Sequence, residues 1–146
     1  MTPVAVRAVL LVAVLVASAL GYVWWRSRQG RVRLVEVAGA LTPAVLGAAR
    51  GPRGTVVQFS TPMCSTCPGV RALLQDVVAE YPGVVHVDID AAERLDLARE
   101  LHIMRTPTTL VLDARGVVVA RMDGAMTRDQ ARQALATLPP PPDYSI

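Results

Sequence analysis

The sequence predicts an α/β domain with a mixed central sheet, preceded by one transmembrane helix. Three observations support this prediction: an uncharged apolar run near the N-terminus, short β-branched runs that alternate with helical patterns, and a terminal pair of strands joined by a tight turn. Alternating strands and helices predict parallel strands, and the terminal hairpin adds antiparallel ones. The expected order of elements in the domain is (β)αβαβαββα, with an optional first strand.

The first expected element is an apolar helix. Residues 8–25 carry no charge, and as a helix they would extend about 27 Å, close to the ~30 Å hydrocarbon core of a bilayer. One tyrosine and two tryptophans gather at its end, where aromatic rings favour the membrane interface. We therefore expect residues 1–28 to anchor the chain in the cell membrane by a single pass. The alternative is a cleaved signal peptide, with Ala17-Ser18-Ala19 as a small-x-small cleavage site.

The positive charge of the chain is concentrated beside this helix. The whole chain has a net charge of +3, but residues 34–146 hold ten arginines against all twelve acids, a formal charge of −2. A mildly acidic domain argues against a nucleic-acid partner. Four arginines follow the apolar run within residues 26–33 and one precedes it. The positive-inside rule therefore favours a cytoplasmic domain, and the alternative is an extracytoplasmic one.

Composition divides the rest of the chain into three parts. Residues 29–40 form a linker that could contribute a short strand at Val32–Val37. Residues 41–138 carry the alternating strand and helix patterns of the domain. Residues 139–146 begin with a run of prolines, which predicts an extended tail.

The helices and strands of the domain follow from apolar spacing and turn residues. Apolar residues at i, i+3, i+4, i+7, i+8 and i+11 from Val70 to Tyr81 predict a helix, and Pro82-Gly83 ends it. Asp113-Ala114-Arg115-Gly116 predicts a hairpin turn, with glycine at the left-handed position. The other expected elements are a helix from Pro43 to about Arg50 capped by Thr42, strands at Thr55–Ser60 and Val84–Ile89, a helix at Ala91–His102, strands at Thr108–Leu112 and Val117–Met122, and a final helix from Thr127 to about Leu138.

Cys64 and Cys67 are the only cysteines, and they form a Cys-x-x-Cys motif directly after the strand at Thr55–Ser60. This placement puts the first sulfur at a helix N-terminus, where the aligned peptide dipoles favour the thiolate. The thiolate is the form that attacks disulfides. A thiol with a pKa near 8.5 is about 3% ionised at pH 7, whereas a pKa lowered to ~7 leaves it half ionised. The motif therefore predicts a reactive thiol with a built-in partner.

Half of a zinc site is the first alternative for this cysteine pair, and an inert structural pair is the second. The two histidines, His86 and His102, are sixteen residues apart, whereas zinc-finger histidines are about three to five apart. One histidine is expected within a strand and the other at a helix end. We therefore expect redox chemistry, with no metal and no cofactor.

The chain resembles the thioredoxin superfamily over roughly residues 41–138. The resemblance rests on three features: the run from Phe59 to Cys67 at a strand-to-helix junction, Thr106-Pro107-Thr108 before a strand, and Asp123-Gly124 after the hairpin. Together with the leading helix, these features are most similar to the small membrane-anchored thioredoxin-like proteins of high-GC, actinobacterial-type bacteria. The resemblance implies a thioredoxin-like fold.

The resemblance also implies a role for each matching residue. Cys64 would be the exposed nucleophile, and Cys67 would be the buried resolving thiol. Pro107 would be a cis-proline facing the sulfurs, and Thr106 would offer its backbone to an extended substrate segment. Met63, beside the motif, would contact the substrate.

Several positions depart from the usual residues of the family. Met63 stands where thioredoxins carry tryptophan, and Ser65-Thr66 replaces the usual Gly-Pro. Gln58 occupies the position of a buried aspartate that helps to move the proton of the resolving cysteine, and a glutamine cannot titrate. His86 lies where the neighbouring strand often supplies a lysine. Gln58 and His86 are therefore candidates for an altered proton relay.

The implied function is that of a membrane-tethered thiol–disulfide oxidoreductase, which reduces or exchanges protein disulfides. Its implied partners are protein disulfide or dithiol substrates and either an upstream thiol reductant or a membrane electron carrier. We expect the protein to be monomeric. Two alternatives are a non-catalytic partner-binding module of the same fold and a persulfide carrier for a sulfurtransferase.

Overall fold

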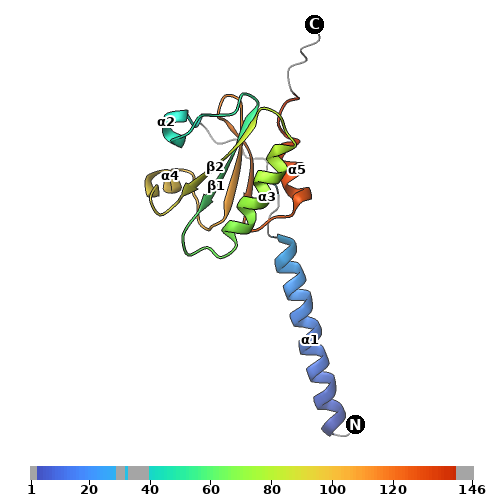
Figure 1. Ribbon diagram of the computed structural model, residues 1–146. Helices are drawn as coiled ribbons and strands as arrows, with labels where there is room; N and C mark the ends of the chain where they lie inside the picture. The colour runs from blue at the N-terminus through green and yellow to red at the C-terminus, as the bar shows by residue number, and fades with distance from the viewer. Residues whose placement is uncertain (1–2, 29–31, 33–39, 141–146) are drawn as a thin grey trace.

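A four-stranded mixed sheet forms the centre of the domain (Figure 1). The computed structural model describes residues 3–28, 32 and 40–140. The strand order is β2-β1-β3-β4, in which β1 runs parallel to β2, while β1 with β3 and β3 with β4 are antiparallel. The predicted mixed sheet is therefore confirmed. The strands are β1 (Gly54–Ser60), β2 (Val84–Asp90), β3 (Thr108–Asp113) and β4 (Val118–Asp123).

Helices cover both faces of this sheet. Figure 1 shows α3 and α5 against one face and α2 and α4 against the other. The helix α1 has no buried residue and extends away from the sheet in Figure 1. The helices are α1 (Pro3–Arg28), α2 (Pro43–Leu46), α3 (Cys67–Ala79), α4 (Leu95–Glu100) and α5 (Arg128–Leu135).

The strand β1 lies between two apolar clusters, and all seven of its residues are buried. Because successive side chains of a strand point to opposite faces, Val56 packs with α3 and α5, while Val57 and Phe59 pack on the side of α2 and α4. A strand covered on both faces has a continuous apolar sequence. This position explains why the run that precedes Cys64 shows no polar alternation.

The hairpin between β3 and β4 forms where the sequence predicts it. Gly116 has a φ of 88°, which a glycine adopts without steric cost. The Asp113 carboxylate accepts hydrogen bonds from the backbone N–H groups of Arg115 and Val117, both at 2.9 Å. Burial opposes ionisation of Asp113, but these hydrogen bonds, together with the guanidinium of Arg115, outweigh it and hold the pKa of the carboxyl below its usual value.

Two of the predicted helices end earlier than expected because local hydrogen bonding changes. The helix α2 stops at Leu46 and not near Arg50, since Gly47 adopts the left-handed conformation with a φ of 68° and caps it. The helix α5 stops at Leu135 and not at Leu138. Its last turn tightens to i→i+3 hydrogen bonds, and the Thr137 hydroxyl donates to the Ala134 carbonyl at 2.6 Å.

The helix predicted over 91–102 is shortened at both ends. It begins at Leu95, because the carboxylate of Asp90 accepts from the Ala92 N–H at 2.8 Å and turns the chain first. It ends at Glu100, where His102 takes a left-handed φ of 51°. The N–H of His102 donates to Arg99 and that of Ile103 to Ala98, the pattern of a Schellman cap.

The predicted N-terminal apolar helix is present. Residues Pro3–Arg28 form one helix that is long and apolar enough to cross a membrane, a property that a signal sequence shares. The possible strand at Val32–Val37, apart from Val32, lies outside the described residues. Residues 29–31, 33–39 and 141–146 of the expected linker and tail also lie outside them.

Candidate active site

The disulfide between Cys64 and Cys67 stands at the start of α3, with its two Cα atoms 5.5 Å apart. Cys64 lies in the loop before the helix and is half-buried. Cys67 is the first residue of α3 and is only 2% exposed. The chain thus presents one cysteine of the pair to solvent and covers the other.

Gln58 joins β1 to the start of α3. Its side chain is fully buried, and its Nε2 donates to the carbonyl oxygen of Cys67 at 3.0 Å. Its Oε1 has no hydrogen-bond partner within the described part of the chain. The structure therefore places the side chain of Gln58 against the backbone of Cys67.

His86, the second residue predicted for a proton relay, is not joined to Gln58. In the register of β1 and β2, His86 lies opposite Val56, and Gln58 lies opposite Asp88. The Nε2 of His86 is buried without a hydrogen-bond partner among residues 3–28, 32 and 40–140. Burial lowers the pKa of His86; the charge of Asp88 opposes this shift, and that of Arg71 adds to it.

The Thr106-Pro107 loop is joined to the loop that carries Cys64. The hydroxyl oxygens of Thr106 and Thr61 are 3.2 Å apart. Thr61 begins the turn before the motif, and its carbonyl oxygen accepts a hydrogen bond from the Cys64 N–H. The Thr106–Pro107 peptide bond is cis. The N–H of Gly124 donates to the Pro107 carbonyl at 2.7 Å. Three sequence features that are far apart in the chain thus meet in one place.

Arg121 of β4 braces the turn that leads into this loop. Its guanidinium donates to the carbonyl oxygens of Leu101 and His102, each at 2.8 Å, and to the Asp123 carboxylate at 3.0 Å. The side chain is only 16% exposed. No local sequence pattern points to Arg121, because nothing near it in the chain relates it to the turn twenty residues earlier.

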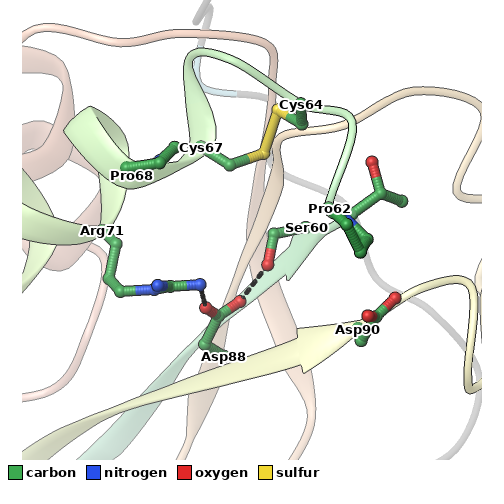
Figure 2. A pocket seen from close by; sticks show the side chains of 9 residues that line it. Ser60, Pro62, Cys64, Cys67, Pro68, Arg71, Asp88 and Asp90 are labelled. Atoms are coloured by element: carbon green, nitrogen blue, oxygen red, sulfur yellow. Dashed lines mark hydrogen bonds and ion pairs between the residues drawn. A yellow bond between two sulfur atoms is a disulfide. The ribbon is translucent and has the colours of Figure 1, made fainter.

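A cavity of about 360 Å³ lies against the disulfide (Figure 2). Inside it the guanidinium of Arg71 pairs with the Asp88 carboxylate, which also accepts a hydrogen bond from the Ser60 hydroxyl. We call this space the charged cavity. Its lining residues come from the ends of β1 and β2, the motif loop and α3: Ser60, Thr61, Pro62, Cys64, Cys67, Pro68, Arg71, Asp88 and Asp90.

The charged cavity was not predicted from the sequence, although two features of the sequence are consistent with it. The carboxyl ends of parallel strands meet at one edge of a sheet, which is where ligands bind in open α/β sheets. Ser60 and Asp90 end two such strands. Arg71 follows Cys67 by four residues, so the two lie on the same face of α3.

A second hollow, of about 330 Å³, shares Thr61 with the charged cavity. We call it the apolar groove, because six of its nine lining residues are apolar, and they come from α4 and from the segments just before and after it. Met63 is 93% exposed beside the motif, and Met104 is 87% exposed at the groove. The groove is lined by Thr61, Ala91, Ala92, Leu95, Ala98, Ile103, Met104, Arg105 and Thr106.

The fold and this site define a thioredoxin-fold domain with a Cys-x-x-Cys centre at a helix start. The chain belongs to the thioredoxin-like domain family, whose model matches residues 43–139. This range agrees with the resemblance drawn over residues 41–138. The family and the cysteine pair together support an oxidoreductase of the thiol–disulfide class.

Individual relatives agree with this assignment. A thioredoxin of Ophiophagus hannah is 32% identical over 77 residues, which cover 51% of this chain and 72% of that protein. A thioredoxin of Methanocaldococcus jannaschii is 35% identical over 54 residues, which cover 36% of this chain and 64% of the relative, a little under two thirds of its length. The crystal structure of the thioredoxin NaTrxh from Nicotiana alata superposes with a TM-score of 0.54 at 28% identity, over 60% of this chain and 76% of that one.

Proposed function

We propose that this protein exchanges disulfides with protein substrates through Cys64 and Cys67. The observation that supports this function best is the unequal burial of the two bonded cysteines. A substrate can approach the sulfur of Cys64, whereas α3 and β1 cover Cys67. An inert structural disulfide has no need of such an asymmetry at the edge of a cavity.

The proposed reaction proceeds in two displacements. In the reduced protein, the Cys64 thiolate attacks one sulfur of a substrate disulfide and forms a mixed disulfide, and the other substrate sulfur leaves as a thiolate. The Cys67 thiolate then attacks the Cys64 sulfur and releases the second substrate thiolate. Two electrons pass to the substrate, whose thiolates take up the protons that the two cysteines lose. Gln58, at the carbonyl of Cys67, cannot accept one of these protons.

We propose that the substrate segment lies extended along Thr106, Pro107 and Met63. Among the described residues, the N–H and C=O of Thr106 make no backbone hydrogen bond, so both are available to an added strand. Met63 offers a flexible apolar surface beside Cys64, and methionine adapts to varied partners.

Anchoring by α1 is the second part of the proposal. We propose a single-pass anchor with a cytoplasmic domain, which an upstream thiol reductant would regenerate. An extracytoplasmic domain would instead need a membrane electron carrier. The test is labelling of reduced Cys64 in intact cells with an impermeant maleimide, in a Cys67→Ser background. A cytoplasmic domain is labelled only after the cells are permeabilised, and labelling of intact cells contradicts this orientation.

The test of the reaction is insulin reduction by the full-length protein in detergent, with dithiothreitol as the donor. We expect Cys64→Ser to lose activity entirely, because no exposed nucleophile is left. When the reduced Cys67→Ser variant is freed of dithiothreitol and then mixed with insulin, it should accumulate mixed disulfides with the substrate, visible on non-reducing gels. Equal activity of the wild type and Cys64→Ser would contradict the proposed function.

A further inference from the structure

The charged cavity indicates the kind of substrate that the disulfide centre prefers, an inference that rests on the proposed function. We propose that Asp90 binds a cationic group, an ammonium or a guanidinium, that lies close to the disulfide attacked by Cys64. The protein would then select substrates by the charge beside their disulfide.

The cavity exists because the end of β1 is a small residue. Ser60 is the last residue of β1, and its short side chain turns toward Asp88. The space between the motif loop, α3 and the end of β2 therefore stays open, with both cysteines in its wall. Figure 2 shows Arg71 on one side of this space and Asp90 on the other, below Pro62. A substituent close to a sulfur that bonds to Cys64 can enter it.

The charges of the cavity leave one carboxylate without a counter-ion. Arg71 and Asp88 form an ion pair and neutralise each other. One oxygen of Asp90, Oδ1, accepts from the Ala92 N–H at 2.8 Å, and no cation pairs with Asp90 among the residues that the structure describes.

The arginine that follows in the chain is directed elsewhere. Arg94 donates to the carbonyl of Val45 at 2.9 Å and lies 3.6 Å from the Asp96 carboxylate. The cavity therefore carries one net negative charge beside the reacting sulfurs. A wall of one sign concentrates ligands of the opposite sign and repels those of the same sign.

The reaction of a cationic disulfide balances without any further reactant. The Cys64 thiolate attacks one sulfur of R–S–S–R and releases R–S⁻, and the Cys67 thiolate then releases the second R–S⁻ and forms the Cys64–Cys67 disulfide. Two protons from the cysteines convert the products to two thiols. The cation on R belongs either to a small aminodisulfide or to a lysine or arginine next to a cysteine of a protein.

The experiment compares three small disulfides of similar size: cystamine, which is cationic, bis(2-hydroxyethyl) disulfide, which is neutral, and 3,3′-dithiodipropionate, which is anionic. The reduced full-length protein in detergent is mixed with each, and the second-order rate of disulfide formation is measured for the wild type and Asp90→Asn. The ratio of the two rates removes the intrinsic reactivity of each probe. Asparagine keeps Oδ1 as the acceptor for Ala92, so the turn is retained.

We expect the wild-type to Asp90→Asn ratio for cystamine to exceed that for the neutral probe roughly three- to ten-fold, the effect of one partly exposed charge at short range. The ratio for the anionic probe should fall below that for the neutral one. Both differences should shrink as salt increases. The matched control is Asp129→Asn on α5, whose side chain is 95% exposed, and it should shift no ratio.

A pair of disulfide peptides that differ only in lysine or glutamine beside one cysteine separates the two sources of the cation. A selective effect on the lysine peptide alone assigns the cation to protein substrates, and one on cystamine alone assigns it to small aminodisulfides. Effects on both show that any cation is accepted. Equal ratios for all probes overturn the role of Asp90 and leave the proposed function intact, whereas a wild type that reacts with no disulfide overturns both.

Discussion

The charged cavity and the apolar groove both have Thr61 in their lining, and they differ in the chemistry that they offer. The charged cavity contains the Arg71–Asp88 ion pair and Asp90, whereas the groove is lined mainly by apolar side chains from α4 and from the segments just before and after it. Both cysteines line the charged cavity, and neither lines the groove. Under the proposed function, the cavity would select a substrate by the charge next to its disulfide, and the groove would make apolar contact with the same substrate.

The difference follows from the elements that build each hollow. The ends of β1 and β2 bring the polar side chains of Ser60, Asp88 and Asp90 into the lining of the charged cavity. The groove is formed by a short helix and a turn, whose side chains can adapt in shape. We therefore expect changes in the groove to alter the binding of whole protein substrates, and changes in the cavity to alter the preference for charge.

The largest expected effect is on stability, from the loss of the Arg121 side chain that holds the turn after α4. Arg121→Ala removes two hydrogen bonds to carbonyl oxygens and an ion pair at a mostly buried position, which should lower the free energy of unfolding by about 2–3 kcal/mol. Urea unfolding followed by circular dichroism measures it, because both tryptophans lie in α1 and do not report on the domain. Arg121→Lys, which keeps the charge without the planar fork, should recover part of the loss. An unchanged midpoint for Arg121→Ala would contradict the brace.

The second largest effect should come from a charge placed in the groove, which should weaken the binding of protein substrates. Met104→Asp changes a residue that is 87% exposed, so folding should be unaffected. The loss of an apolar contact of about 1 kcal/mol should raise the KM for insulin roughly five-fold. The rate with bis(2-hydroxyethyl) disulfide is the internal control and should not change. If both substrates slow down equally, the groove does not bind the protein substrate.

Glycine in place of His102 should stabilise the turn that follows α4. His102 has a φ of 51°, a left-handed conformation that costs a side chain roughly 1 kcal/mol relative to glycine. His102→Gly should therefore raise the free energy of unfolding by about 0.5–1 kcal/mol. The matched variant His102→Ala keeps the Cβ and should give no such gain. A fall in stability on His102→Gly would show that the imidazole makes a contact of its own.

The smallest expected effect is a pH dependence of stability caused by His86 on β2. Because burial lowers the pKa of His86 from its usual value of 6.5, the unfolded chain binds a proton more readily than the folded one. The contribution of His86 is therefore fully present above pH 6.5 and is lost as the pH falls through the lower pKa of the folded state. The free energy of unfolding should decrease less between pH 7.5 and pH 5.5 in His86→Gln than in the wild type. Parallel decreases would assign the pH dependence to other groups.

Local patterns were sufficient to predict most of the fold. The period of the apolar residues predicted α3, the β-branched runs predicted β1 and β2, and the turn at Asp113–Gly116 predicted the final hairpin. The ends of α2 and α4 were wrong, because a left-handed residue can end a helix that its side chains would continue. At His102 the left-handed turn is closed by hydrogen bonds back to the carbonyl oxygens of Arg99 and Ala98, which the apolar spacing of the helix does not encode.

The sequence by itself determined the reactive pair and its position, since Cys64 and Cys67 are neighbours in the chain and a strand must end before them. Tertiary structure alone decided what surrounds the pair. Arg71, Asp88 and Ser60 come from three elements, and their contacts depend on the register of β2 against β1 and on the rotation of α3. A register shift of one residue would turn Asp88 to the other face of the sheet. The chemistry of a two-cysteine centre is therefore local, whereas the charge and shape of its surroundings depend on packing.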